Sequence, residues 1–116
     1  MNSLKLLSLI LLFFCSNIIF SQTTSNQIII RTEFLSETDK VMVRIIDNGM
    51  GISEEVKSQI FDPFFTTKPV GKGTGLGLAI SYQIVEEKHK GKLECFSELG
   101  KGTEFRIEIS SKRQIV

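Results

Sequence analysis

The chain has 116 residues, of which 41% are hydrophobic and 23% charged, with 14 Lys and Arg against 13 Asp and Glu. This length allows one domain, and the composition is that of a chain that can bury a core. A net charge of +1 argues against a protein that holds nucleic acid by neutralising its phosphates. Two cysteines and one histidine exclude a disulfide scaffold and a Cys/His zinc cluster.

The N-terminal segment differs in composition from the rest of the chain. Residues 6–20 carry no charge, Lys5 precedes them and a polar run follows at 21–27. That order is typical of a signal peptide, and counted from Leu4 the run reaches 17 residues, the lower limit for a membrane anchor. We therefore predict a separate segment at 1–27 that contacts an inner membrane or the export machinery through residues 4–20. A buried hydrophobic helix is the alternative.

Residues 28–46 predict a β-hairpin. The run IIIRTEFL at 28–35 is rich in β-branched and aromatic side chains, and VMVRII at 41–46 would place Val41, Val43 and Ile45 on one face of a second strand. Residues 36–40 between them have the composition of a turn.

Two helices are expected after this hairpin. Ser53 can cap a short helix that runs to about Ile60, because its hydroxyl can accept a hydrogen bond from an unpaired N–H group. Apolar residues at helical spacing predict a second helix at 76–89, and Gly91 ends it.

Two more strands are predicted at 92–97 and 103–109, joined by a hairpin turn. Four strands and two helices indicate an α/β (α+β) two-layer sandwich, with the helices on one face of a mostly antiparallel mixed sheet. Residues 28–110 would form this domain, and 111–116 would be a tail.

A glycine-containing loop, Asp47-Asn48-Gly49-Met50-Gly51, follows the second strand. A carboxylate at a strand end can accept a hydrogen bond from an exocyclic amine such as that of adenine. Gly49 and Gly51 allow the backbone to approach a flat ring closely. Taken alone, the motif is more typical of an ordinary Asp-Asn-Gly turn.

A second glycine-rich loop runs directly into the predicted helix at 76–89. Its backbone N–H groups can point into one concavity, and the helix start adds a positive dipole end, which together suit phosphate. The loop is neither a Walker A motif nor a dinucleotide fingerprint, and a flexible linker is the alternative. The candidate residues are Gly73, Thr74, Gly75, Leu76 and Gly77.

The segment FDPFFTTK at 61–68 lies between the two loops and holds three phenylalanines. They could seat a lid or dock a partner. We expect Phe61 and Phe64 to lie in the core and Phe65 to be more open.

The order of DNGMGI at 47–52, FDPFFTTK at 61–68 and GTGLGLAIS at 73–81 resembles the catalytic ATP-binding domain of bacterial sensor histidine kinases. The resemblance covers about residues 28–110 and implies a Bergerat-type fold of the superfamily that includes gyrase, heat-shock chaperone and MutL ATPases. It implies that Asp47 reads the adenine amine, with Gly49 and Gly51 against the base. It also implies that residues 73–77 surround the phosphates of ATP or ADP as part of a lid.

The sequence departs from the family pattern before residue 28. The family's N box, whose asparagine holds Mg²⁺, has no counterpart, so the fold is expected to be incomplete and the Mg²⁺ ligand to be missing. The phosphoacceptor is also absent, because His89 is followed by Lys90 and Gly91 at a helix end. We therefore expect no catalytic and no metal-binding residue in this chain.

The resemblance implies a function in two-component signalling. The chain would be the cytoplasmic ATP-binding portion of a histidine kinase, which transfers phosphoryl groups from ATP to a protein histidine. Its partners would be a dimerisation or histidine-phosphotransfer domain, or a response regulator, supplied in trans. The alternatives are an inactive nucleotide-binding or kinase-docking fragment and a truncated gene product.

Overall fold

The structure is a computed structural model that describes residues 25–112. The predicted signal or anchor at 4–20 and the residues after Lys112 lie outside this range. Among the described residues, no helix has both the length and the apolar character needed to cross a membrane.

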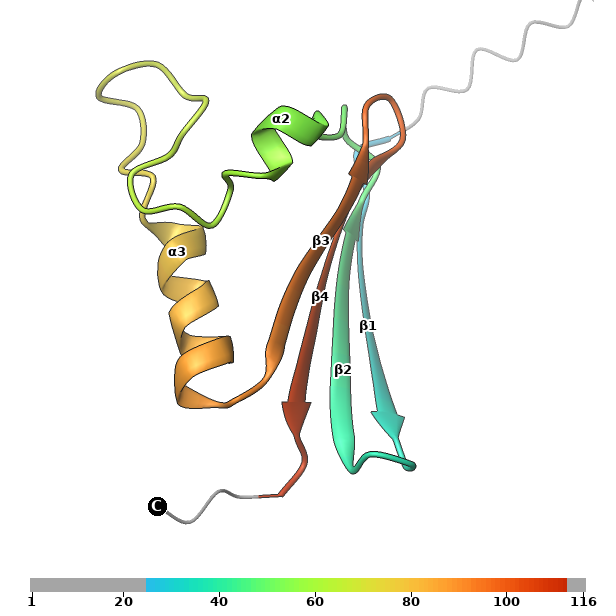
Figure 1. Ribbon diagram of the computed structural model, residues 1–116. Coiled ribbons are helices and arrows are strands. Elements are labelled where there is room, and N and C mark those ends of the chain that lie inside the picture. Colours follow the sequence, from blue (N-terminus) through green and yellow to red (C-terminus); the bar gives the residue numbers. More distant parts are fainter. Residues whose placement is uncertain (1–24, 113–116) are drawn as a thin grey trace, which may run out of the picture.

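Four antiparallel strands form one sheet (Figure 1). Their order across the sheet is β1-β2-β4-β3, so each predicted hairpin is present and the two hairpins join through β2 and β4. The described strands show none of the parallel pairing of a mixed sheet. The strands are β1 (Ile28–Leu35), β2 (Lys40–Asp47), β3 (Lys92–Glu98) and β4 (Gly102–Ser110).

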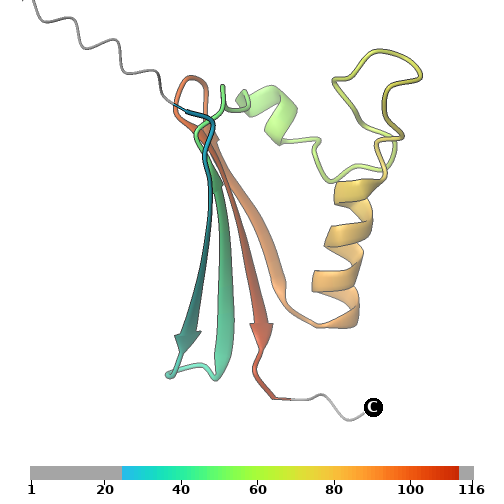
Figure 2. The same ribbon diagram turned by 180° about the vertical axis from the view of Figure 1, so that it is seen from behind.

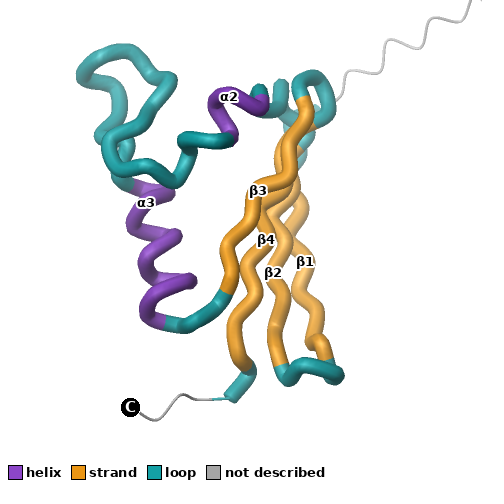
Figure 3. The backbone as a smooth tube through the Cα atoms, in the orientation of Figure 1, coloured by secondary structure: helices purple, strands orange, loops and turns teal. Residues whose placement is uncertain are grey.

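The helices lie on one side of this sheet, as Figures 1 and 2 show from opposite directions. They are α2 (Glu54–Lys57), α3 (Gly77–Tyr82) and the π-helix η1 (Gln83–Lys88), which continues α3 without a break (Figure 3). Ser53 caps α2 as predicted, because its Oγ accepts from the N–H of Val56 at 3.3 Å. The helix ends at Lys57, earlier than expected. The predicted two-layer α/β fold is confirmed.

The core is small and lies between the helices and one half of the sheet. Helix α2 contacts β3, and η1 contacts β3 and β4. The buried apolar side chains are Ile60, Ala79, Val85 and Leu93. None of these belongs to β1 or β2. On β1, Ile30 is 67% exposed and Phe34 57% exposed, although strand alternation places both on the helix-bearing face.

The opposite face of the sheet carries a compact charged cluster. Arg44 donates from Nε and Nη2 to the two carboxylate oxygens of Glu104, each at 2.8 Å. Arg106 donates to the same carboxylate at 2.9 Å, and its guanidinium lies 4.3 Å from the centre of the Phe96 ring. The hydrogen bond from Arg44 is the main reason why the pKa of Glu104 falls to about 2. This cluster joins β2, β4 and β3 by side chains as well as by backbone.

The Glu104 cluster predicts a specific pH dependence of stability. Pairing lowers the pKa of Glu104 from its ordinary value of 4.5 to about 2, so the ionised carboxylate stabilises the folded state. This stabilisation is complete at a pH above the ordinary pKa of 4.5, and it is lost as the pH falls through the folded-state pKa of about 2. We expect Glu104→Gln to lower the free energy of unfolding by about 1 kcal/mol at about pH 7. The difference in unfolding free energy between wild type and Glu104→Gln should shrink once the pH is below the ordinary pKa of 4.5. It should vanish when the pH approaches the folded-state pKa of about 2.

Urea unfolding of both proteins across this pH range measures the effect. A difference that stays constant with pH would show that the substitution acts through packing and not through the charge of the carboxylate.

Candidate functional site

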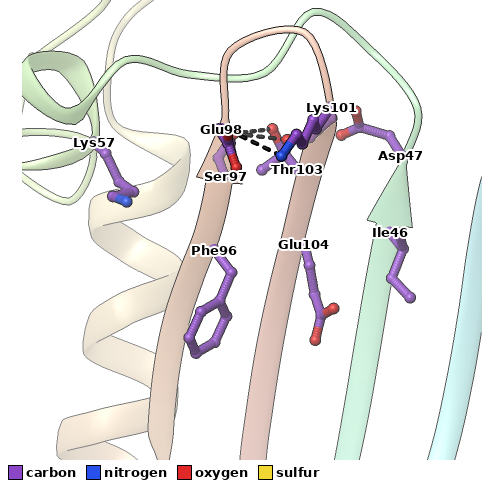
Figure 4. A pocket seen from close by; sticks show the side chains of 10 residues that line it. Ile46, Asp47, Lys57, Phe96, Ser97, Glu98, Lys101, Thr103 and Glu104 are labelled. Carbon is purple, nitrogen blue, oxygen red and sulfur yellow. Dashed lines mark hydrogen bonds and ion pairs between the residues drawn. The ribbon is translucent and has the colours of Figure 1, made fainter.

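Asp47 stands at the end of β2, where the strand meets the first glycine loop. Its Oδ1 accepts from the N–H of Gly49 at 2.8 Å, and a Cβ on Gly49 would lie 2.9 Å from that oxygen. The register sets Asp47 opposite Thr103 on β4, and Thr103 opposite Ser97 on β3. Since cross-strand partners share a face, these three side chains form a row at one end of the sheet (Figure 4).

Two hydroxyl groups fasten the loop after β2 to the hairpin between β3 and β4. Ser97 Oγ accepts from the N–H of Ile52 at 2.8 Å and donates to the carbonyl of Gly102 at 2.8 Å. Because a serine hydroxyl has one hydrogen, Thr103 must be the donor in the 2.9 Å contact between the two hydroxyl oxygens. Thr103 is buried, so this contact also satisfies a buried polar group.

Backbone packing at this junction requires glycine at two positions. Gly51 has φ +76° and a Cβ there would collide with the carbonyl oxygen of Glu98. Gly102 has φ +98° and a Cβ there would collide with the carbonyl oxygen of Asp47. Gly100 completes the junction by donating its N–H to the carbonyl of Met50 at 2.7 Å. The close approach is thus between backbone and backbone, where no side chain can move aside.

An open cavity of about 440 Å³ lies beside this row. Its volume falls within the usual range for small-molecule pockets. Lys101, which forms an ion pair with Glu98 at 3.1 Å, brings a cation to the same end of the sheet as Asp47 (Figure 4). The lining residues are Ile46, Asp47, Lys57, Phe96, Ser97, Glu98, Lys101, Gly102, Thr103 and Glu104.

The second glycine loop lines a different pocket, of about 380 Å³. Four of the predicted residues border it, together with Lys68 and Phe65, whereas Leu76 does not and instead precedes α3. Leu76 donates its N–H to Thr74 Oγ1 at 3.4 Å, a bond that stays within the loop. The full lining is Ile60, Phe65, Thr66, Lys68, Gly73, Thr74, Gly75, Gly77 and Leu78.

The phenylalanine segment holds this loop in place through its backbone. The N–H of Phe64 donates to the carbonyl of Gly75 at 3.0 Å, and a Cβ on Gly75 would lie 2.5 Å from the carbonyl carbon of Phe64. The expectation that Phe64 lies in the core is wrong, because its side chain is 73% exposed. Its backbone has a φ of +66°, in the left-handed region that is uncommon for a residue other than glycine. Phe61 packs on Tyr82 with ring centres 5.2 Å apart.

The two groups of predicted residues do not share a cavity. Asp47 lies at the end of the sheet, and the glycine loop projects beyond α2 on the helical side (Figures 1 and 2). No residue lines both pockets. Ser97, Thr103 and Lys101 join Asp47 although nothing in the sequence singled them out. The only sequence signal was the predicted hairpin, and it did not reveal their register with Asp47.

The described residues contain no cluster of metal-ligating side chains. Within residues 25–112, no three His, Cys, Asp or Glu side chains come together as metal ligands. The side chain of Asn48 is already engaged, because its Nδ2 donates to the carbonyl of Ser25 and its Oδ1 accepts from the N–H of Gln27, both at 2.9 Å. Burial raises the pKa of the Cys95 thiol, which disfavours a reactive thiolate there.

A sequence model described as "Histidine kinase-, DNA gyrase B-, and HSP90-like ATPase" matches residues 2–113. The chain belongs to this family of ATPases. It is 52% identical over 73 residues to the sensor kinase CckA of Brucella abortus, covering 63% of this chain and 8% of CckA. It is 39% identical over 94 residues to a probable C4-dicarboxylate sensor kinase of Halalkalibacterium halodurans, covering 81% of this chain and 17% of that one. The chain thus spans less than a fifth of the length of these relatives.

Solved structures agree with this assignment. The catalytic domain of the histidine kinase ThkA superposes with a TM-score of 0.65 at 37% identity, over 85% of this chain and 63% of that one. Full-length ShkA in complex with AMPPNP superposes with a TM-score of 0.63 at 27% identity, over 73% of this chain and 17% of ShkA. The predicted fold and the predicted kinship with sensor histidine kinases are therefore confirmed.

The junction around Asp47 predicts unequal costs for two alanine substitutions in the same turn. Gly102→Ala forces a collision with the Asp47 carbonyl, whereas Gly100→Ala meets nothing within 4 Å at a comparable φ of +82°. We expect Gly100→Ala to cost about 1–2 kcal/mol of unfolding free energy from the left-handed backbone alone. Gly102→Ala should cost clearly more and should also disturb Asp47.

Urea unfolding of the two variants, with two-dimensional NMR of residues 47–51, measures both effects. Equal losses of stability would show that the backbone of β2 can move away from the hairpin at little cost.

Proposed function

We propose that this chain binds adenine nucleotide and is the ATP-binding part of a sensor histidine kinase. The observation that carries this is the Asp47 carboxylate, held by Gly49 at the edge of an open cavity. Within residues 25–112, Asp47 Oδ1 accepts the Gly49 N–H and no hydrogen bond occupies Oδ2, so Oδ2 would accept from the exocyclic amine. Membership in a family of ATPases and the likeness to ShkA, solved with AMPPNP, support the same assignment.

The carboxylate would select adenine over guanine. Adenine presents an amine at the position where guanine presents a carbonyl, and a carboxylate facing a carbonyl is repelled and leaves both acceptors without a donor. Gly49 and Gly51 would lie against the base, since neither has a side chain to hold it away.

We further propose that residues 73–77 surround the phosphates. The glycine-loop pocket contains Lys68, and the loop backbone can offer several N–H groups to an anion. Because this pocket and the Asp47 cavity are separate, a nucleotide that uses both would require the loop at 62–75 to move toward the end of the sheet. The two backbone contacts between Phe64 and Gly75 would make the phenylalanine segment move together with the glycine loop.

The acceptor of the phosphoryl group would be supplied by another domain or chain. The one histidine of this chain is His89, which follows η1, while the glycine loop precedes α3. The continuous helix from Gly77 to Lys88 lies between them, so His89 is at the far end of this helix from the glycine loop. A dimerisation or histidine-phosphotransfer domain acting in trans, with a response regulator downstream, would therefore provide the substrate. We place this reaction in the cytoplasm, where ATP is available.

A second candidate function is nucleotide binding without phosphoryl transfer. It is favoured by the lack of a metal-ligand cluster within the described residues. Phosphoryl transfer depends on metal-assisted stabilisation of charge, and no residue of the described part can be assigned to that role.

The Asp47 assignment predicts selective loss of adenine binding. We expect the full chain to bind ADP more tightly than GDP, and Asp47→Ala to weaken ADP binding about 10- to 100-fold, the usual value of a hydrogen bond to a charged group. GDP binding should not weaken and should become tighter, because the substitution removes the repulsion between the carboxylate and the guanine carbonyl. Glu37→Ala, an exposed acidic residue in the turn at the other end of β2, is the matched control and should bind like wild type. Calorimetric titration gives the constants, and equal affinity in all combinations would sink the assignment.

The position of His89 predicts that the chain does not phosphorylate itself. Incubation with labelled ATP and Mg²⁺ should leave the chain without acid-labile label, in wild type and in His89→Ala alike. Adding a separately purified dimerisation domain that bears its acceptor histidine distinguishes the two candidate functions. Label on the acceptor that disappears with Asp47→Ala would favour kinase activity in trans. No label, with ADP binding intact, would favour the binding module. Acid-labile label on His89 would contradict the geometric argument.

A further inference from the structure

Strand β1 is an edge of the described sheet, and its outer side has no partner strand there. The groups it presents can be identified from one hydrogen bond. The carbonyl of Gln27 accepts from the N–H of Asn48, the residue after β2, at 3.4 Å. Because the N–H and C=O of a residue in an antiparallel strand point to the same side, the odd-numbered residues of β1 face β2. The free edge therefore presents the backbone groups of Ile28, Ile30, Thr32 and Phe34.

This edge is long, apolar and exposed, which is the kind of edge that invites pairing with another strand. All residues of β1 except Leu35 are exposed. Two charges lie within it, Arg31 and Glu33, and neither forms an ion pair within residues 25–112. In the register with β2, Arg31 even stands opposite another cation, Arg44. Within the described part of the chain, both charges of β1 are therefore free to form an ion pair with a partner.

We propose that β1 pairs with β1 of a second copy of this chain, antiparallel and with the two-fold axis at Thr32. A symmetric antiparallel pair in which the outward backbone groups of both strands meet can be centred on any residue of β1. Arg31 and Thr32 are the two middle residues of the strand, so centres there give the longest overlap. A centre at Arg31 would set two arginines opposite each other, whereas a centre at Thr32 sets Arg31 directly opposite Glu33 of the other copy.

The side chains match in this register as well as the backbone. The Arg31–Glu33 pair occurs twice, once on each side of the axis, at the non-hydrogen-bonded positions where side chains are closest. On the helix-bearing face Ile30 would pack on Phe34 of the second copy, and on the other face Ile29 would pack on Leu35. Ile29, Ile30 and Phe34 are each at least 42% exposed in the single chain. The pairing would join two four-stranded sheets into one.

The proposed interface is separate from the nucleotide site. Asp47 stands opposite Ile28, at the far end of β1 from its C-terminal turn. In an antiparallel pair about Thr32, the two Asp47 residues would lie at opposite ends of the joined sheet. Nucleotide binding and pairing can therefore be measured and can fail independently.

Charge reversal tests the register. Arg31→Glu places two acidic side chains opposite each other on each side of the axis, and Glu33→Arg places two basic ones there. We expect each variant alone to raise the dimer dissociation constant about tenfold or more. An equal mixture of the two variants restores both ion pairs, so it should form the mixed dimer. The double variant Arg31→Glu/Glu33→Arg should dimerise like wild type.

The measurement uses the full chain in a mild non-ionic detergent, with two affinity tags and light scattering after gel filtration. Glu37→Arg is the matched control, since it reverses a charge outside the strand and opposite an uncharged residue. ADP binding and circular dichroism confirm that each variant is folded. As a second measurement, Thr32→Cys in a Cys15→Ser/Cys95→Ser background should form a disulfide-linked dimer on mild oxidation, and Ser36→Cys in the same background should not.

Two results would overturn the proposal. A wild-type chain that stays monomeric at all concentrations would show that the β1 edge is not used or is covered by another part of the chain. Dimers that are insensitive to the charge of residues 31 and 33 would show association through a different surface, such as the apolar segment at 6–20.

Discussion

The contact between the backbone of the Asp47 loop and the β3–β4 hairpin is the constraint on which the candidate site depends. The carbonyl oxygen of Glu98 occupies the space that a Cβ on Gly51 would need, and the carbonyl oxygen of Asp47 occupies the space that a Cβ on Gly102 would need. The Ser97 hydroxyl then bonds to both segments at once, from the N–H of Ile52 to the carbonyl of Gly102. Residues that are some 50 positions apart in the chain are thus held as one rigid edge, and a carboxylate on that edge has a defined orientation.

The rest of the sheet is less evenly supported. Helical cover and buried apolar side chains are concentrated over β3 and β4, whereas β1 and β2 keep much of their apolar surface exposed within the described residues. On the other face, the Arg44–Glu104–Arg106 cluster ties β2 to β4. Within residues 25–112, β1 gains neither helical cover nor ion pairs, so there it depends mainly on its hydrogen bonds to β2. That asymmetry is the physical reason why β1 is the element most available for a further contact.

The two pockets lie on different kinds of structural element, and this difference bears on how a nucleotide would bind. The Asp47 cavity is built from strands and a tight hairpin, which are rigid elements. The glycine-loop pocket is built from a segment with positive φ at Phe64, Gly71 and Gly75, anchored to the rest by the start of α3. A loop that becomes ordered when the phosphates bind loses conformational entropy, whereas a rigid base site loses little. The affinity for nucleotide would therefore depend on the loop more than on the sheet. Selectivity for the base would instead depend on Asp47.

The amino-acid sequence by itself determined the strands, the cap at Ser53, both glycine loops and the family, because alternation, capping and loop composition are local properties. It did not reveal the exposure of Phe64, the end of α2 at Lys57 or the π-helical turns of η1. Only the tertiary structure decided that Ser97 and Thr103 stand in a row with Asp47, and that the glycine loop lines a separate pocket. The reason is physical: strand register and the placement of a loop are set by contacts between distant segments, and no local pattern encodes those contacts.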